Sequence, residues 1–128
     1  MLTSRDVTGE GLRSVISFAS YFDIRNHCGR VFGISQTQPR GFEFPTFQEL
    51  VPPADAVWKV KRAEISWDEF SAIYRVVLME RHDDIVSWIE WVPPEEFTLC
   101  CWERRPDRCH RSIAAEFLSS LGYPVHVV

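Results

Sequence analysis

The pattern of hydrophobic and polar positions predicts strands and helices that alternate along the chain. Arg30 to Ser35 and Phe97 to Trp102 are short runs of apolar, β-branched and aromatic side chains, which is typical of buried strands. Tyr123 to Val128 has the composition of a last strand. The patterns of Leu12–Tyr21 and Ala56–Val60 are mixed and fit either a helix or an extended segment.

Helices are predicted where apolar residues recur with helical spacing. Ser66 stands three residues before Glu69, as in a capping box, and the apolar face that follows extends to Leu78. A second helix is predicted over Asp83 to Trp91, and a third from about Cys109 to Leu121.

The order strand, helix, strand in the last third of the chain is a βαβ unit, which implies parallel strands. We therefore expect one α/β domain over residues 1–128, with a mostly parallel sheet and helices on its faces, hence three layers. The length of 128 residues suits one domain with its own core. Residues 1–11 are polar, and we expect them to be loosely ordered.

Charge and hydropathy narrow the classes of partner. A formal net charge of −4 argues against a protein that wraps duplex nucleic acid, although it leaves room for a local basic patch. No stretch approaches the roughly 18 apolar residues of a membrane span, and the first residues lack the apolar run of a signal peptide. We therefore expect a cytoplasmic protein that does not bind membranes.

Cysteines and aromatic residues add little to this interpretation. The four cysteines match no disulfide framework, and a cytoplasmic location would keep them reduced. The five Trp and nine Phe residues favour core packing. The alternative is an exposed aromatic surface that binds bases or a partner. The oligomeric state is left open.

The segment from Glu103 to Ser112 carries the strongest candidate chemistry. It follows a buried strand and leads into a helix, at the edge of the sheet where ligands of parallel α/β proteins gather. Asp107 is the expected N-cap, which places Cys109 and His110 in the first helical turn. Backbone N–H groups at that turn attract anions. Four arginines add positive charge: Arg104, Arg105, Arg108 and Arg111.

Each side chain in this segment has a possible role. A thiol at a helix start beside Arg and His has reason for a lowered pKa, so Cys109 is a candidate nucleophile. His110 could act as a general base or a ligand, and Glu103 as an acid, a base or an orienting group. Arg111 could grip a phosphate or carboxylate. The structural alternatives are a small buried Cys109, solvated loop arginines and a buried ion pair between Glu103 and Arg111.

Known motifs do not extend these assignments. Neither Cys101 nor Cys109 has the arginine six residues later that a phosphatase loop requires, and no phosphate-binding or dinucleotide-binding glycine motif is present. His27-Cys28, Cys101 and Cys109-His110 could in principle form a zinc site, but nothing in their spacing favours one. We therefore predict no metal and no cofactor.

Several stretches resemble the domain of unknown function 488 family, over roughly residues 24–128. The similar positions are Glu103, Cys109-His110-Arg111, Ala114-Ala115-Glu116, Leu118 and Gly122 with Val125. Upstream they are Gly33-Ile34-Ser35, Pro39-Arg40-Gly41-Phe42, Leu50-Val51-Pro52 and Ser66 to Tyr74, with Phe70 where tyrosine is more usual.

This resemblance implies a compact Rossmann-like α/β fold and a pocket around Cys109, His110, Arg111 and Glu103. It also indicates Ser35, Arg40 and Arg25 as possible wall residues that bind substrate. The family name implies no established activity.

Three hypotheses follow. The protein is an enzyme acting on an anionic or phosphate-bearing substrate, in which Cys109, His110 and Glu103 are catalytic. Or it is a non-catalytic module that binds a nucleotide or nucleic acid at the same helix start. Or Arg111 and Glu103 form a structural ion pair and the working surface lies elsewhere.

Overall fold

The structure, a computed structural model, describes residues 15–92, 95–104 and 109–128. Its strands are β1 (Ile16–Ser20), β2 (Arg30–Gly33), β3 (Phe97–Cys101) and β4 (Val125–Val127). Its α-helices are α1 (Ala54–Lys61), α2 (Trp67–Glu80), α3 (His82–Trp91) and α4 (His110–Ser120). Two short 3₁₀ helices are η1 (Ile24–Asn26) and η2 (Gln48–Leu50).

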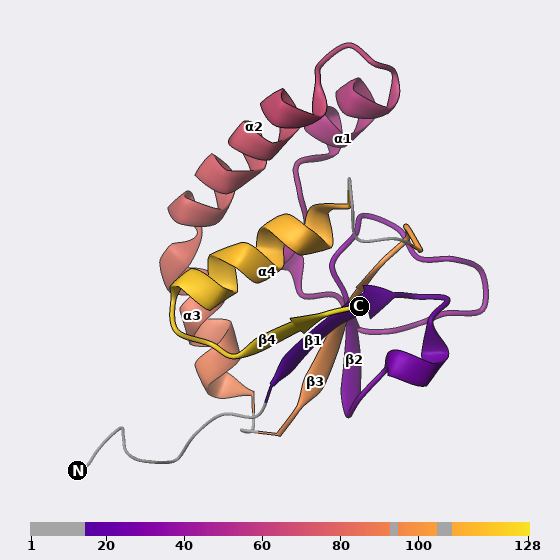
Figure 1. Ribbon diagram of the computed structural model, residues 1–128, viewed down its shortest axis with the longest axis vertical. Coiled ribbons are helices and arrows are strands. Elements are labelled where there is room, and N and C mark those ends of the chain that lie inside the picture. Colours follow the sequence, from indigo (N-terminus) through magenta and orange to yellow (C-terminus); the bar gives the residue numbers. More distant parts are fainter. Residues whose placement is uncertain (1–14, 93–94, 105–108) are drawn as a thin grey trace.

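The described strands form one parallel sheet in the order β2-β3-β1-β4. The chain passes from β1 to the β2 edge, returns to β3 in the centre, and reaches the opposite edge at β4. The carboxyl ends of parallel strands meet at one edge of the sheet, which lies near the C-terminus in Figure 1. The expected α/β class and parallel sheet are confirmed.

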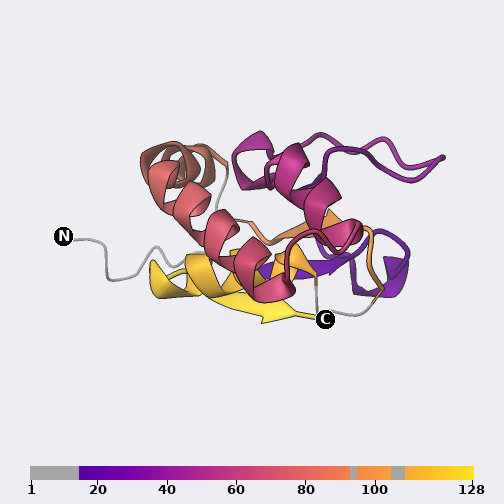
Figure 2. The same cartoon turned by 90° about the horizontal axis from the view of Figure 1, so that it is seen from above.

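Helices cover one face of the sheet, and the chain between β1 and β2 covers the other. Figure 2 shows α1, α2 and α3 on the same side of the strands. On the opposite face, Thr98 Oγ1 accepts a hydrogen bond from the backbone N–H of Cys28 (2.7 Å) and donates one to its carbonyl (2.8 Å). The three layers are therefore the helices, the sheet and a thin cover that includes η1.

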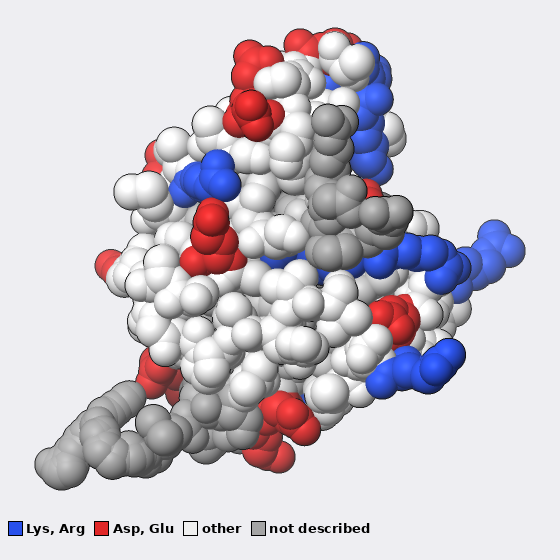
Figure 3. Space-filling model, in the orientation of Figure 1, with Lys and Arg blue, Asp and Glu red and all other residues white. Residues whose placement is uncertain are grey.

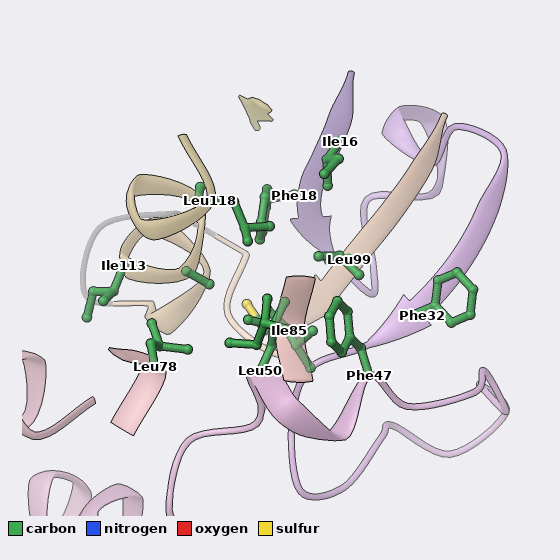
Figure 4. Close-up of a cluster of buried hydrophobic side chains, with 14 of the residues drawn as sticks. Ile16, Phe18, Phe32, Phe47, Leu50, Leu78, Ile85, Leu99, Ile113 and Leu118 are labelled. Atoms are coloured by element: carbon green, nitrogen blue, oxygen red, sulfur yellow. The ribbon is translucent and has the colours of Figure 1, made fainter. Parts of the chain in front are cut away.

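The core lies between the sheet and the helices. Side chains from β1 and β3, such as Phe18 and Leu99, share one buried cluster with Ile113 and Leu118 of α4. Figure 4 shows these side chains together with those of α2, α3 and η2. Because α4 joins the same cluster, its N-terminus is fixed above the end of β3.

The two ambiguous segments become a central strand and a helix. All five residues of β1 are buried, because β1 lies between β3 and β4 and is covered on both faces. Its sequence, ISFAS, mixes apolar residues with buried serines over only five positions, so its pattern could not be distinguished from that of a helix. α1 is only eight residues long and directly follows two prolines.

The other predicted elements are found with small shifts at their ends. Ser66 Oγ accepts a hydrogen bond from the Glu69 N–H (3.0 Å), and the Glu69 carboxylate accepts one from the Ser66 N–H (2.8 Å), which confirms the capping box. No helix in the described part of the chain is long and apolar enough to cross a membrane. The prediction for residues 1–11 falls outside the described residues.

Candidate functional site

The end of β3 and the start of α4 bring Cys101, Cys109 and His110 together. β3 ends at Cys101, and α4 begins at His110 with Cys109 as its N-cap residue. The prediction of Asp107 as N-cap is wrong, because Cys109 still has an extended backbone (φ −120°, ψ 137°). Asp107 itself lies outside the described residues. Cys109 therefore precedes the first helical turn.

The structure pairs Cys101 with Cys109 as a disulfide inside the protein, and Cys28 and Cys100 are free. The expectation that all four cysteines are reduced is therefore wrong for this pair, because the fold brings the end of β3 against the start of α4. The exposed fractions of Cys101 and Cys109 are 0% and 1%. The Cα atoms lie 7.7 Å apart, whereas disulfide-bonded cysteines usually have Cα atoms roughly 4.4–6.8 Å apart. The backbone spacing of this pair is therefore wider than that of most disulfides. The spacing of cysteines along the chain gives no sign of this contact, which depends on where α4 begins.

Arg111 is fully buried and points into the fold. Its Nη1 donates to the sulfur atoms of Cys101 (3.2 Å) and Cys109 (3.3 Å) and to the backbone oxygen of Glu103 (2.6 Å). Its Nη2 donates to the backbone oxygens of Arg104 and Val128, both at 3.1 Å. The guanidinium thus ties the loop after β3, the start of α4 and the end of β4 together. Its observed bond to Glu103 is made to the main chain of that residue.

His110 is held by the end of β2. Its Nε2 lies 2.6 Å from the carbonyl oxygen of Ile34. A carbonyl oxygen can only accept, so Nε2 carries the proton and Nδ1 of the neutral ring carries the lone pair. Burial lowers the pKa of His110 to about 4, so the ring is neutral at pH 7.

Glu103 completes a cluster of four donor groups. One sulfur each from Cys101 and Cys109, a ring nitrogen of His110 and a carboxylate oxygen of Glu103 all lie within 4.8 Å of one another. The two sulfur atoms are buried, His110 is half-buried and Glu103 is exposed. The cluster therefore has an inner side made of sulfur and an outer side that faces solvent.

Two cavities open beside the outer side of this cluster. One of about 660 Å³ lies against the end of α1 and the start of α2, and one of about 380 Å³ lies between α1 and the loop after β2. Val57, Lys61, Glu103 and His110 line both. The smaller cavity is also lined by polar groups of the loop after β2 and by two tryptophans, Trp58 and Trp102.

The remaining candidate residues are placed differently. Ser35 is buried, lines the smaller cavity, and has its Oγ 2.6 Å from both the Tyr21 hydroxyl and the Thr37 carbonyl oxygen. Arg25 and Arg40 are exposed and line neither cavity. Arg104 is also exposed, with its guanidinium carbon 4.6 Å from the ring centroid of Phe22.

The other residues proposed from the sequence either lie away from this site or are not among the described residues. Arg105 and Arg108 are not among the described residues. His27 and Cys28 contact Cys100 and Thr98, on the face of the sheet opposite to the helices. The four-donor cluster therefore forms without them.

Lys61, Trp58 and Trp102 were not predicted as site residues. The first two lie on α1, more than forty positions before Glu103, and α1 carries no motif. Only the path of the chain from β2 to α2 brings α1 over the end of β3. Trp58 and Lys61, three residues apart, belong to no motif that the sequence analysis could have used.

A comparison with protein-family models identifies the chain. The model described as the active DUF488-N3 subclade matches residues 5–122. The chain belongs to the DUF488 family. No curated protein matches it, and no solved structure does. The DUF488 match agrees with the resemblance seen in the sequence and specifies no reaction.

Proposed function

We propose that this DUF488 protein is an enzyme that binds a nucleotide or a similar phosphate-bearing ligand in the cleft beside Glu103 and His110. The observation that carries this proposal is that both cavities share Glu103, His110 and Lys61 as lining residues. A carboxylate, an imidazole and an ammonium group thus line both cavities, at the carboxyl edge of a parallel sheet, and Glu64 and Glu69 also line the larger one. This edge is where open α/β sheets bind their ligands.

Among the described residues that line the two cavities, Lys61 is the cation that an anionic ligand would meet. Arg111, expected to grip the phosphate, is turned inward and bonded to backbone oxygens. Lys61 lines both cavities, and its Nζ lies 5.8 Å from the ring centroid of Trp58. Figure 3 shows blue Lys and Arg side chains along the side of the molecule where α1 lies. A phosphate would approach the cleft from this side.

The smaller cavity suits a planar ring. Trp58 is 58% exposed and Trp102 is 38% exposed, and both line this cavity. Trp102 is held in place because its Nε1 donates to the Thr37 carbonyl oxygen at 2.8 Å. Stacking of a base on an aromatic side chain contributes about 1–3 kcal/mol. A nucleobase between these side chains would leave its phosphate near Lys61.

The catalytic groups of the proposal are Glu103 and His110, supported by Cys109. Glu103 is an exposed carboxylate that can accept a proton, and neutral His110 can hold a substrate atom or an ion through the lone pair of Nδ1. Cys109 is 1% exposed and lies behind them. Its sulfur lies within 4.8 Å of the donor atoms of Glu103 and His110.

Binding is tested by thermal unfolding of the full chain with adenosine monophosphate, adenosine and inorganic phosphate. We expect the monophosphate to raise the Tm by several degrees, because a ligand at 100 times its Kd adds about 2.7 kcal/mol to stability. Lys61→Ala should remove most of that shift. Lys59→Ala is the matched control, because Lys59 lies on the same helix but pairs with Asp55 and lines neither cavity. Equal shifts in the two variants would refute the assigned site.

Turnover is tested by incubating a panel of nucleotides with the protein and separating the products by chromatography. Glu103→Gln should keep the thermal shift and lose the conversion. If the wild type binds nucleotides but converts none of the panel, the result contradicts the enzyme proposal and favours a non-catalytic binding module.

A further inference from the structure

We propose that Cys101, Cys109, His110 and Glu103 form a binding site for one zinc ion. Their donor atoms lie within 4.8 Å of one another. Two thiolates, an imidazole and a carboxylate are all zinc ligands, and the soft sulfur pair disfavours magnesium and calcium. The ion's role in turnover rests on the function proposed above, whereas its binding is measured without any substrate.

The backbone spacing of the two cysteines fits a bridging ion. Zinc binds thiolate sulfur at about 2.3 Å in tetrahedral geometry, which places the two sulfur atoms about 3.8 Å apart. In the reduced protein, the Cα separation of 7.7 Å leaves room for that wider sulfur pair in place of the direct bond between the two sulfur atoms. Because β3 and α4 supply one cysteine each, the ion would link the strand end to the helix start.

His110 is oriented as metal-binding histidines are. Such histidines usually donate their other ring N–H to a carbonyl or carboxylate, which fixes the tautomer. His110 Nε2 makes this bond to the Ile34 carbonyl at 2.6 Å. Nδ1 is therefore the ligand atom of the proposed site.

Arg111 contacts the sulfur pair from the interior of the protein, where it would stabilise the two zinc ligands without binding the ion itself. Its Nη1 donates to both sulfur atoms, at 3.2 and 3.3 Å. Hydrogen bonds of this kind stabilise thiolates over thiols. The charges also balance: two thiolates and one carboxylate offset the zinc ion and the buried guanidinium.

Glu103 is the zinc ligand that water or substrate would replace. Catalytic zinc sites have three protein ligands and an open position for water or substrate, and two cysteines with one histidine form such a set. Glu103 is exposed and lines both cavities, whereas the sulfur atoms are buried behind it. Release of the carboxylate would open the ion to the cleft.

The test measures zinc bound by the full chain after reduction and removal of metal. Elemental analysis should find about one zinc ion per chain after incubation with Zn²⁺ and desalting. Binding should release about two protons in weakly buffered solution, one from each thiol. Cobalt in place of zinc should give thiolate-to-metal charge-transfer absorption.

Variants assign the ligands. Cys101→Ser and Cys109→Ser should each lose most of the zinc, and His110→Ala should weaken binding by about 10- to 100-fold or more. Cys28→Ser is the matched control and should bind as the wild type, because Cys28 lies on the other face of the sheet. If a cysteine variant does not fold, protection of Cys101 and Cys109 from iodoacetamide by Zn²⁺ in the wild type replaces it.

A reduced, folded wild type that binds no zinc, or that binds it equally in Cys28→Ser and Cys109→Ser, would overturn the inference. A Cys101–Cys109 disulfide that forms readily in air while zinc does not bind would do the same and assign a redox role to the pair. Lys61→Ala separates this inference from the proposed function. It should abolish nucleotide binding and keep the full zinc content.

Discussion

Arg111 is the largest fully buried side chain of the described residues, and it is also charged. Removing a cation from water costs several kcal/mol unless the surrounding groups replace its hydration. The backbone oxygens of Glu103, Arg104 and Val128, together with two sulfur atoms, do this for Arg111. Arg111 therefore holds the segments around Cys109 and His110 in position. The cation that lines the two cavities is Lys61.

Arg111→Ala should destabilise the protein by about 3 kcal/mol or more, because it removes three part-buried hydrogen bonds from a charged donor, each contributing about 1.5–3 kcal/mol. Urea unfolding followed by tryptophan fluorescence measures the change. Arg75→Ala is the matched control, since Arg75 is exposed and pairs with Glu116 on the surface, where such pairs contribute about 0–1 kcal/mol. A similar small loss in both variants would contradict the role of Arg111.

Tyr21 should make the protein less stable in alkali. Burial raises the pKa of its hydroxyl from 10.0 to about 12. Between these values the unfolded chain ionises Tyr21 and the folded protein does not, so stability falls as pH rises through this range. The expected loss is about 1.4 kcal/mol per pH unit. Tyr21→Phe should show a shallower fall in urea unfolding between pH 10 and 12, and an unchanged slope would contradict the prediction.

At the scale of elements, the N-terminus of α2 forms a wall of the larger cavity. Ser66 and Glu69 line that cavity and close the capping box. Ser66→Ala should therefore cost about 1 kcal/mol of stability, measured by thermal unfolding. Ser119→Ala serves as control, because Ser119 is exposed within α4 and alanine is favoured there. Equal effects of the two substitutions would argue against the cap.

Elements with strong periodicity or clear boundaries could be predicted, and those defined by tertiary context could not. α2 was found from its capping box and apolar face, and β3 from its apolar run. β1 is ambiguous because its five residues mix apolar side chains with two buried serines, which is too short and too mixed a pattern to show one period. α1 was ambiguous because eight residues show few repeats, and only Ala56 of α1 is buried.

The candidate site shows the same division. Cys109 and His110 were found because they are close in sequence and begin a helix after a strand. Their contact with Cys101, the orientation of Arg111 and the approach of Lys61 depend on packing between elements far apart in sequence. Local pattern contains no information about such contacts.

On the scale of the whole molecule, the central strands of the sheet are fully buried, whereas α1 packs loosely at the periphery. β3 and β1 are the central strands, and all ten of their residues are buried. α1 buries a single residue, and Figure 1 shows it at one end of the molecule, beside α2. The cleft therefore lies between a part that resists opening and a part that is weakly held.

Hydrogen exchange should reveal this difference. Amide protons of β3 should exchange only through global unfolding, whereas those of α1 should exchange through local opening and be faster by orders of magnitude. Adenosine monophosphate should slow exchange in α1, because a ligand bound against Val57 and Lys61 stabilises the closed helix. Mass spectrometry of peptides covering 54–61 and 97–101 measures both effects. Equal protection of the two segments, without a change on addition of the nucleotide, would show that α1 is as rigid as the sheet and would remove it from the binding site.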